Sequence, residues 1–253
     1  MTIDPSRAPA LSVLIPFYNE AGNVDSVIAE VHAQLAGIAF EVICVNDASD
    51  DATGSELDQA KLKWPGTVHV FTHVERKGKS AALFTGLKSI RGTWTQLLDG
   101  DGQNDPADTA RLWKEIIVPG APAKLGIIAG KRNSRNDSVF KWLQSRVANG
   151  MRRFMLRDDA TDTGCGWKLI RTEAFRDLPF FASMHRFLPA LIKRAGWEVR
   201  EELVNDRERL HGQSKYGFFG RLGAGIFDLL GVFWLVRRGG YGVAREWDDP
   251  RTR

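Results

Sequence analysis

The stretch Leu11–Glu20, LSVLIPFYNE, sets a pattern that the first half of the chain repeats. Its apolar run from Leu11 to Pro16 is too short for a helix but has the length of a buried strand. Strands that are apolar on both faces belong in parallel sheets covered by helices. The run leads directly into the polar residues Tyr18 and Glu20. The stretch therefore predicts a core strand followed by a loop with functional groups.

Similar apolar runs and amphipathic stretches alternate from Leu11 to about Gly130. The other expected strands are Phe40–Asn46, Val68–His73, Trp94–Leu98 and Leu125–Gly130. Apolar residues at three- and four-residue spacing predict helices over Asn23–Leu35, Ser55–Leu62, Ser80–Ile90 and Thr109–Val118. This alternation predicts an α/β fold, with a mostly parallel sheet between two layers of helices.

Composition excludes several classes of protein. The chain has 253 residues, 43% hydrophobic and 26% charged, with a net charge of +4, which suits one globular domain and not a disordered, fibrous or solenoid protein. Its two cysteines, Cys44 and Cys165, exclude a disulfide framework and favour a reducing, cytosolic setting. The first ten residues do not resemble a secretory signal.

Acidic residues follow three of the expected strands. Glu20 follows the first, Asp47 the second, and Asp99 with Asp101 the fourth. Because parallel strands end at one edge of a sheet, we expect these acids in one cleft. Such carboxylates repel one another unless a cation lies between them. The turn Asp99–Gln103 offers hard oxygen ligands, which suit Mg²⁺ or Mn²⁺ shared with phosphate oxygens.

Other common sites are not supported by the sequence. It has no cysteine and histidine cluster with zinc spacing, no Walker spacing and no dinucleotide fingerprint after a strand. Cations and glycines that could approach a diphosphate occur in two loops, Arg76–Ser80 and Arg209–Lys215. In the first, Gly78 allows the backbone to come close to an anion. A solvated loop is the alternative interpretation of the second.

Two amphipathic stretches differ from the rest of the chain. Residues 131–157 hold eight basic residues against the single acid Asp137, and Lys141, Ser145 and Arg152 share one helical face. They predict either a surface helix that covers the sheet or a helix that meets an anionic membrane or a phosphate. The stretch from Phe218 to Trp234, which ends in Arg237 and Arg238, favours a membrane interface over core packing. Arg221 and Asp228 argue against a spanning helix.

These motifs together resemble glycosyltransferase family 2. The resemblance rests on SVLIPFYNE, VICVNDASDD, LLDGDGQNDP, TDTGCGWKLI and RLHGQSKYG, and it spans residues 11 to 240. Within the family, LLDGDGQNDP and RLHGQSKYG are similar to the dolichyl-phosphate mannose synthase-like polyprenyl-phosphate glycosyltransferases. The resemblance implies the three-layer α/β/α fold of nucleotide-diphospho-sugar transferases, with C-terminal amphipathic interface helices. The expected organisation is a flexible N-terminus (1–10), a catalytic domain (11–216), an interface helix (217–240) and a tail (241–253).

The resemblance also implies roles for individual residues. The donor-binding residues would be Pro16, Tyr18, Glu20, Asp47, Gly78, Asp99, Gly100, Asp101, Gln103, Arg209 and Lys215. Of these, the metal ligands would be Asp99, Asp101 and Gln103, and the catalytic residues Asp99, Asp101, Arg209 and Lys215. The acceptor phosphate would lie on Arg132, Lys141 and Ser145, with His211 close to the donor phosphates. Where the family more often has Arg, Lys141 keeps the charge without the bidentate fork.

The implied activity is inverting transfer of a sugar from a nucleotide diphosphate to a polyprenyl phosphate. A lipid phosphate is already anionic near neutral pH, so it needs no catalytic base. We expect its oxygen to attack the anomeric carbon directly, while Mg²⁺ or Mn²⁺ and the cations stabilise the leaving diphosphate. Two alternatives remain open: a family 2 enzyme acting on a polysaccharide or soluble hydroxyl, and a non-enzymatic nucleotide-binding or scaffold module.

Location and partners follow from the same resemblance. We expect a peripheral protein on the cytoplasmic side of the membrane that binds a nucleotide sugar, a polyprenyl phosphate and the membrane surface, and no nucleic acid. A partner membrane protein or a second copy of the chain would assist it there. The donor remains open between GDP-mannose and a UDP-sugar, because Asp47 could accept from guanine or uracil. Mannose, glucose, an amino sugar and a uronic acid all fit the sequence.

Overall fold

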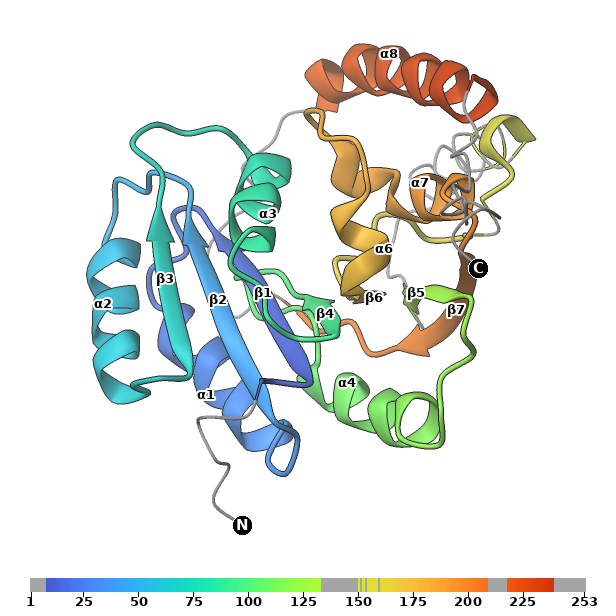
Figure 1. Cartoon of the computed structure of the whole chain (residues 1–253). Helices are drawn as coiled ribbons and strands as arrows, with labels where there is room; N and C mark the ends of the chain where they lie inside the picture. Colours follow the sequence, from blue (N-terminus) through green and yellow to red (C-terminus); the bar gives the residue numbers. More distant parts are fainter. Residues whose placement is uncertain are drawn as a thin grey trace, which may run out of the picture.

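The fold is built on one seven-stranded sheet (Figure 1). The computed structural model describes residues 8–132, 150, 152, 154–158, 160–208 and 218–238, and side chains of the last range from residue 225 onward. The strands are β1 (Leu11–Phe17), β2 (Phe40–Asn46), β3 (Val68–Thr72), β4 (Trp94–Leu97), β5 (Leu125–Arg132), β6 (Lys168–Arg171) and β7 (Glu198–Val204). Their spatial order is β3-β2-β1-β4-β6-β5-β7. Only β6 runs against its neighbours, so the sheet is mostly parallel.

Helices cover both faces of the sheet. One face packs against α1 (Val24–Gln34), α2 (Thr53–Lys63) and α4 (Pro106–Leu112), which continues as a π-helical turn over Trp113–Ile117. The other packs against α3 (Lys79–Leu87), α6 (Thr172–Arg176), the 3₁₀ turn Met184–Arg186 and α7 (Leu188–Arg194). These are the three predicted layers. Outside them, α8 (Phe218–Arg237) packs on α7 and is the outermost helix in Figure 1.

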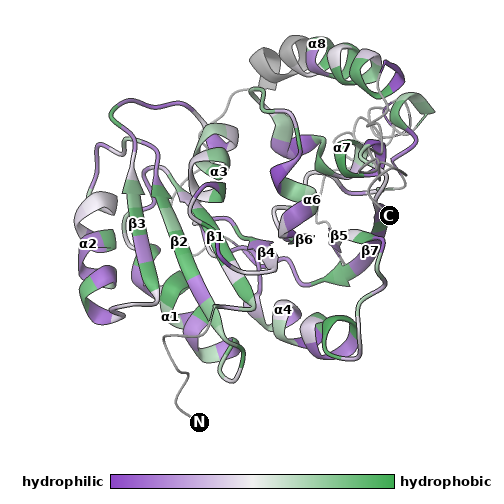
Figure 2. Cartoon of the chain, viewed as in Figure 1, coloured by the Kyte–Doolittle hydropathy of each residue, from purple (hydrophilic) through white to green (hydrophobic). Residues whose placement is uncertain are grey.

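The protein has two hydrophobic cores, one on each face of the sheet, because side chains alternate between the faces along the central strands. Val13 and Ile15 of β1 face α1 and α4, whereas Leu14 between them faces α3. Because both faces are buried, every residue from Leu11 to Ile15 is buried in spite of the alternation. Figure 2 shows the resulting hydrophobic colour along β1 and β2. The strand prediction from the apolar runs is confirmed for all five runs, with ends that differ by at most two residues.

The N-terminus of α4 shows how local chemistry moves an element boundary. The spacing predicts a helix from Thr109, but α4 begins at Pro106. The side chain of Asp105 accepts a hydrogen bond from the backbone nitrogen of Ala107 at 2.9 Å, and Pro106 occupies the first helical position. Both are strong signals for a helix start. The helix therefore begins three residues after the turn Asp99–Gln103 and anchors the end of that turn.

The outer helix α8 has two different faces. Val232 is buried, and Leu229 and Phe233 pack beside it against the second core. On the opposite side Phe227 is 79% exposed and Trp234 61% exposed. The expected amphipathic helix is thus present over Phe218–Arg237. Of the helices that the structure describes, none is both long and apolar enough to cross a membrane.

The basic stretch 131–157 is described only at its two ends. Residues 133–149, with Lys141 and Ser145, lie outside the described part of the chain. The prediction that Arg152 belongs to an exposed basic face is wrong, because this side chain is 6% exposed and is paired with the buried Asp158 at 2.7 Å. A buried guanidinium needs such a partner. Phe154, two residues further on, is 84% exposed.

Candidate functional site

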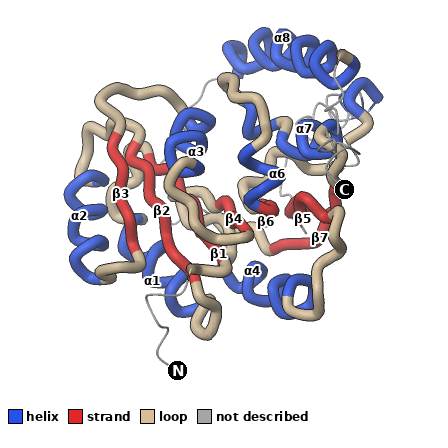
Figure 3. The backbone as a smooth tube through the Cα atoms, viewed as in Figure 1, coloured by secondary structure: helices blue, strands red, loops and turns tan. Residues whose placement is uncertain are grey.

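Three strands end together at one edge of the sheet. The backbone nitrogen of Asp47, after β2, donates to the oxygen of Phe17 in β1 at 2.8 Å. On the other side of β1, the nitrogen of Leu98 donates to the oxygen of Leu14 at 3.2 Å. The loops that leave β1, β2 and β4 therefore start near one another, and Figure 3 draws in tan the neighbouring loop that leads from β3 to α3. The sheet brings the predicted acids to one edge.

The loops after β1 and β2 are fastened to each other. The nitrogen of Asn19 donates to the hydroxyl of Ser49 at 3.0 Å, and the nitrogen of Asp50 donates to the amide oxygen of Asn19 at 3.0 Å. Asn19 has a φ of 52°, in the left-handed region that Asn tolerates. The nitrogen of Glu20 donates to the hydroxyl of Thr53 at 2.8 Å, and the carboxylate of Glu20 accepts from Asn23. Glu20 is thereby held at the rim, half-buried.

Asp47 is buried and organises the loop before α3. Its carboxylate accepts from the backbone nitrogens of Lys77 at 2.8 Å and Gly78 at 2.7 Å, and it lies 2.7 Å from Nδ1 of His73. Gly78 has a φ of 86°, a conformation that glycine adopts at little cost. The acid predicted to contact the base thus also fixes Gly78, the glycine predicted to approach the donor. A contact of Asp47 with the base stays a prediction.

An aromatic side chain and a cation flank this loop. The guanidinium of Arg76 lies over the ring of Tyr18 at 4.0 Å from its centroid. Arg stacks favourably on aromatic faces. Pro16 is also among the residues predicted to bind the donor. It is half-buried in β1 and lies beside Val45 of β2. Tyr18, Pro16 and Glu20 therefore come from one short segment at the edge where β1 ends.

Asp99 lies in a cluster of cations. Its carboxylate forms an ion pair with Lys79 at the start of α3, and its backbone nitrogen donates to the side-chain oxygen of Asn104 at 2.9 Å. Burial raises the pKa of Asp99, but Lys79 and then Lys168 outweigh it, so the pKa lies below its ordinary value. Burial in turn lowers the pKa of Lys168 to about 8. Asp99 is therefore an ionised carboxylate with a cation on either side.

The turn after Asp99 depends on two glycines. A Cβ at Gly100 would lie 2.5 Å from the ring of Phe17, so only glycine allows this approach to the end of β1. Gly102 has a φ of 75°. Between them, Asp101 is 7% exposed, and its carboxylate accepts from the nitrogen of Gln103 at 3.2 Å. The turn thus holds Asp101 firmly beside β1.

The chemistry of this turn fits a divalent cation. The amide nitrogen of the Gln103 side chain donates to the backbone oxygen of Arg207 at 3.3 Å, and its amide oxygen is a hard ligand by chemical type. Mg²⁺ and Mn²⁺ need only one or two carboxylates when substrate phosphates complete the shell. Across the described residues, no group of three or more His, Cys, Asp or Glu side chains could hold a metal.

Arg132, predicted for the acceptor phosphate, is held by an acid. Its Nε and Nη2 donate to the two carboxylate oxygens of Asp162 at 2.7 and 2.9 Å, and Nη1 lies 3.7 Å from Asp206. Burial opposes its charge, but Asp162 raises the pKa of Arg132 above its ordinary value. The guanidinium is permanently charged and fixed in orientation. Its contact with an acceptor stays a prediction.

Four predicted residues lie outside the described part of the chain. They are the acceptor residues Lys141 and Ser145 and the donor-phosphate residues Arg209 and Lys215, together with the neighbouring His211. The described chain approaches both segments, since β5 ends at Arg132 and the loop after β7 is described up to Glu208.

Lys168 and His185 near Asp99, and Arg207 after β7, were not predicted from the sequence, whereas Lys79 belongs to the predicted loop Arg76–Ser80. Lys79 and His185 converge at the start of α3, where the hydroxyl of Ser80 lies 2.8 Å from Nδ1 of His185. Lys168 lies in β6 and donates to the backbone oxygen of Cys165, and Arg207 lies after β7 and pairs with Glu30 at 2.8 Å. One signal was present for Lys168: it is a lone charge in the apolar run Trp167–Ile170.

Comparison of sequences places the chain among known proteins. The sequence model of the family Glycosyl transferase family 2 matches residues 12–179. A dodecaprenyl-phosphate galacturonate synthase of Rhizobium johnstonii is 30% identical over 93% of this chain and 70% of its own length. An undecaprenyl-phosphate 4-deoxy-4-formamido-L-arabinose transferase of Pseudomonas fluorescens is 30% identical over 89% of this chain and 65% of its own length. The chain thus spans about two thirds of the length of these relatives.

Comparison of folds finds solved structures with a similar fold. A mannosyltransferase from Pyrobaculum calidifontis, solved with GDP-Man and Mn²⁺, matches with a TM-score of 0.61 at 17% identity, over 95% of this chain and 67% of that one. A glucosyl-3-phosphoglycerate synthase from Mycobacterium tuberculosis, solved with Mn²⁺, UDP and phosphoglyceric acid, matches with a TM-score of 0.67 at 17% identity, over 92% of this chain and 80% of that one. At this identity the likeness concerns the fold alone.

Proposed function

The chain belongs to glycosyl transferase family 2, and on that premise we propose that it transfers a sugar from a nucleotide diphosphate to a polyprenyl phosphate, with inversion at the anomeric carbon. The observation that carries the proposal is the 30% identity, over 93% of this chain, to an enzyme named for making a dodecaprenyl-phosphate-linked sugar. The edge where β1, β2 and β4 end supports it, because it gathers acids, cations and glycines from three loops.

We assign the donor to this edge. The nucleoside lies in the proposal against Pro16, Tyr18 and Glu20, with Asp47 toward the base and Gly78 beside the phosphates. Arg209 and Lys215 neutralise the diphosphate. Lys79 adds a cation that already contacts Asp99. Preorganised cations of this kind stabilise the charge that develops on a leaving group.

Asp101 and Gln103, with Asp99 close by, would hold Mg²⁺ or Mn²⁺. When bound, the ion supplies Lewis-acid stabilisation to the departing diphosphate. The residues of the chain position the groups around it. Gly100 brings the turn against Phe17, and the hydrogen bond from Gln103 to Asp101 fixes the direction of the carboxylate. The Lys79 contact keeps the neighbouring Asp99 ionised.

The acceptor approaches farther along the sheet, where β5 ends at Arg132. In the proposal Arg132, Lys141 and Ser145 hold its phosphate. Nε and Nη2 of Arg132 already donate to Asp162, so in the proposal the phosphate accepts from the remaining N–H groups of the fixed guanidinium. An acceptor phosphate is its own nucleophile and attacks the anomeric carbon without a base. The enzyme would act at the cytoplasmic face of the membrane, with α8 on the surface.

A donor panel tests the proposal. The full chain is incubated with Mn²⁺, a polyprenyl phosphate and radiolabelled UDP- or GDP-linked sugars, a uronic acid and an amino sugar among them. We expect one donor to move its label into the organic phase, and nuclear magnetic resonance of the product to show the inverted anomer. Label that instead reaches only water-soluble hydroxyl acceptors would contradict the polyprenyl acceptor. Donor binding without any transfer would contradict an enzymatic role.

A further inference from the structure

A single side chain of β7 holds the segment that precedes β6. The carboxylate of Glu201 accepts from the backbone nitrogen of Thr161, from the hydroxyl of Thr161 at 2.8 Å and from the backbone nitrogen of Asp162 at 3.2 Å. Both carboxylate oxygens take part, and hydrogen bonds to an ionised acceptor are stronger than those between neutral groups. Glu201 is not among the residues assigned above to the donor, the metal or the acceptor.

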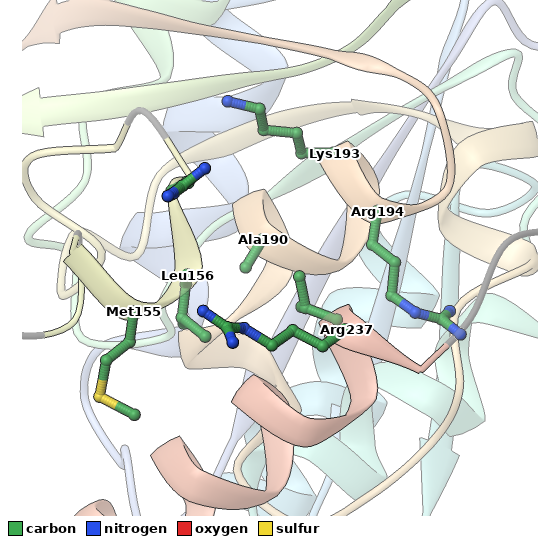
Figure 4. Close-up of a pocket in the computed structure, with 8 residues that line it drawn as sticks. Met155, Leu156, Ala190, Lys193, Arg194 and Arg237 are labelled. Atoms are coloured by element: carbon green, nitrogen blue, oxygen red, sulfur yellow. The ribbon is translucent and has the colours of Figure 1, made fainter.

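The chain on either side of this stretch is anchored in the two cores. Before it, Leu156 is buried and lines, together with Ala190 of α7, a cavity of about 430 Å³ (Figure 4). After it, Trp167 is fully buried in the core on the opposite face of the sheet. Glu201 therefore holds a stretch that lies between two anchored ends and outside helices and strands, where backbone groups need side-chain partners.

Asp162 in turn contacts Arg132 at the end of β5. Two nitrogens of the guanidinium donate to its two carboxylate oxygens at 2.7 and 2.9 Å, and a Cβ at Gly164 would lie 3.3 Å from Nη2. These contacts fix the plane of the guanidinium and the direction of its remaining N–H groups. Because the pair is bidentate, any movement of Asp162 turns those N–H groups with it.

The same segment reaches the donor side of the site. A Cβ at Gly166 would meet the carboxylate of Asp99, so the backbone approaches this acid more closely than a side chain would allow. Gly164 and Gly166 are two residues apart, and two residues span at most about 7 Å. The segment held by Glu201 therefore borders Arg132 and then Asp99, which are assigned to the acceptor and to the donor.

We propose that Glu201 is a positioning residue for the acceptor phosphate. It holds Thr161 and Asp162 so that Asp162 turns the remaining N–H groups of Arg132 toward that phosphate. The inference rests on the proposed function, which supplies the acceptor and the assignment of Arg132. Glu201 itself touches neither substrate, so its loss should change how the acceptor is held before it changes the binding of the donor.

Two neighbouring variants of the full chain test the role of Glu201. Glu201→Ala removes the carboxylate, and Glu202→Ala is the matched control, because Glu202 lies on the other face of β7 and pairs with Arg200 at 2.6 Å. The acceptor is farnesyl phosphate, whose binding is measured by titration calorimetry and whose KM by turnover with Mn²⁺ and the donor found in the panel. We expect Glu201→Ala to weaken binding and raise this KM about tenfold, the effect of one lost charge-assisted hydrogen bond to the phosphate. Glu202→Ala should match wild type.

The KM for the donor shows whether the effect is confined to the acceptor. Lys79 and Asn104 hold Asp99 independently of Glu201. The KM for the donor in Glu201→Ala should therefore stay within about twofold of wild type. A loss that falls equally on both substrates would indicate a general disturbance of the fold and would overturn the inference.

A double variant shows whether Glu201 acts through Arg132. In an Arg132→Gln background, Glu201→Ala should weaken farnesyl phosphate binding by less than about twofold, because residues that act through one another are not additive. Losses that multiply would mean that Glu201 acts independently of Arg132 and would overturn the inference. Unchanged binding in Glu201→Ala alone would overturn it as well.

Replacement of Thr161 keeps the test decisive if Glu201→Ala does not fold. Thr161→Val keeps the shape of the side chain but removes the hydroxyl that donates to Glu201, whereas Thr161→Ser keeps that hydroxyl. We expect Thr161→Val to raise the acceptor KM about threefold and Thr161→Ser to stay close to wild type. Thermal unfolding shows that each variant is folded. Equal acceptor KM values for the two variants would contradict the positioning role.

Binding and transfer together separate this inference from the proposed function. If wild type transfers sugar to farnesyl phosphate and Glu201→Ala does so with the same acceptor KM, the inference fails and the proposed function stands. If wild type binds farnesyl phosphate but transfers no sugar, the proposed function fails, and the binding measured for Glu201→Ala still decides the role of Glu201.

Discussion

At the scale of single residues, the two acids of the Asp-Gly-Asp turn differ in their surroundings. Asp99 forms an ion pair with Lys79, so much of its charge is already compensated. Asp101 lies beside β1, where its carboxylate accepts from the backbone nitrogen of Gln103. We therefore assign the contact with a metal-bound diphosphate chiefly to Asp101.

Replacing Asp101 by Asn tests this assignment. Asn keeps the size and most hydrogen bonds of the side chain but removes the charge that a metal–diphosphate needs, so we expect kcat to fall on the order of a hundredfold or more. The measurement is turnover with donor, Mn²⁺ and polyprenyl phosphate. Asp58→Asn, an exposed carboxylate of α2, is the control and should keep wild-type kcat. Near-normal turnover of Asp101→Asn would remove the metal assignment.

Lys168 predicts a pH dependence of stability. Burial lowers its pKa from 10.5 to about 8, so between those values the unfolded chain binds more protons than the folded one. The contribution of Lys168 to the free energy of unfolding should therefore rise with pH from about 8 to 10.5, by up to about 3 kcal/mol. Below pH 8 the buried charge lowers stability by the same amount. The buried thiols of Cys44 and Cys165 have raised pKa values and oppose this rise in both proteins, so urea unfolding across this range should show a more positive slope in wild type than in Lys168→Met; equal slopes would contradict the burial of a charged amine.

At the scale of elements, the Asp-Gly-Asp turn is fixed by its contact with β1. A methyl group at Gly100 would lie 2.5 Å from the ring of Phe17 and 3.1 Å from the backbone oxygen of Pro16. We expect Gly100→Ala to lower the free energy of unfolding by about 1–3 kcal/mol and to reduce kcat, because the turn must move away from β1. Urea unfolding and turnover measure the two effects.

Two variants accompany this measurement. Gly231→Ala in α8, where a methyl group meets nothing within 4 Å, should leave stability and kcat unchanged or slightly improved. Phe17→Leu combined with Gly100→Ala should restore part of the loss by making room. If Gly100→Ala is as stable and active as wild type, the turn does not depend on this contact.

The segment 152–160 is fastened by a buried ion pair. Arg152 donates to Asp158 at 2.7 Å, and Asp158 is 0% exposed. Arg152→Met leaves the buried carboxylate without its guanidinium, so we expect a loss of about 3–5 kcal/mol in urea unfolding. Removing the exposed pair Lys63–Asp25 by Lys63→Met should cost no more than about 1 kcal/mol. If Arg152→Met and Lys63→Met both lower the free energy of unfolding by a similar small amount, the side chain of Arg152 is exposed and not buried.

The elements that the sequence predicts share one property: their hydrophobic pattern is set by burial alone. The strands β1 to β5 are short apolar runs, and all were predicted. The strands β6 and β7 were not, because β6 carries Lys168 inside its run and β7, EVREELV, is charged along most of its length. β7 pairs with β5 at the edge of the sheet, where charged side chains are tolerated. The antiparallel direction of β6 depends on tertiary pairing and has no local signal.

The candidate site, like the sheet, could be predicted from the sequence only in part. Acids at strand ends identify the edge of the sheet, because parallel topology brings those ends together. Lys168 and His185 near Asp99 could not be found this way, since they come from β6 and the turn before α7, whose positions depend on the unpredicted half of the sheet. The burial of Arg152 was also missed, because its acid Asp158 lies beyond the helix and an amphipathic pattern carries no information on such a partner.

At the scale of the whole molecule, the proposed substrates meet the sheet at two places. The donor is assigned to the edge where β1, β2 and β4 end, and the acceptor to the end of β5, three strands away from β1 in the sheet order. The outer helix α8 packs on α7, on the face of the sheet that α3 also covers. A water-soluble donor and a lipid-borne acceptor can therefore reach the enzyme independently. The remaining chemical question is which group supplies the attacking oxygen.

The pH dependence of kcat/KM for the acceptor answers that question. A phosphate monoester loses its second proton near pH 6, so if it attacks unaided, kcat/KM for the acceptor should fall about tenfold per pH unit below about 6. The decisive comparison is a difluoromethylene phosphonate acceptor, whose second proton is more acidic. With this analogue we expect the acid limb of the profile to move to lower pH by the difference between the two acceptor pKa values, in wild type and in Asp58→Asn alike. A limb that stays fixed when the acceptor changes would report a titrating group of the enzyme, and with it a base-catalysed transfer of the kind that a hydroxyl acceptor requires.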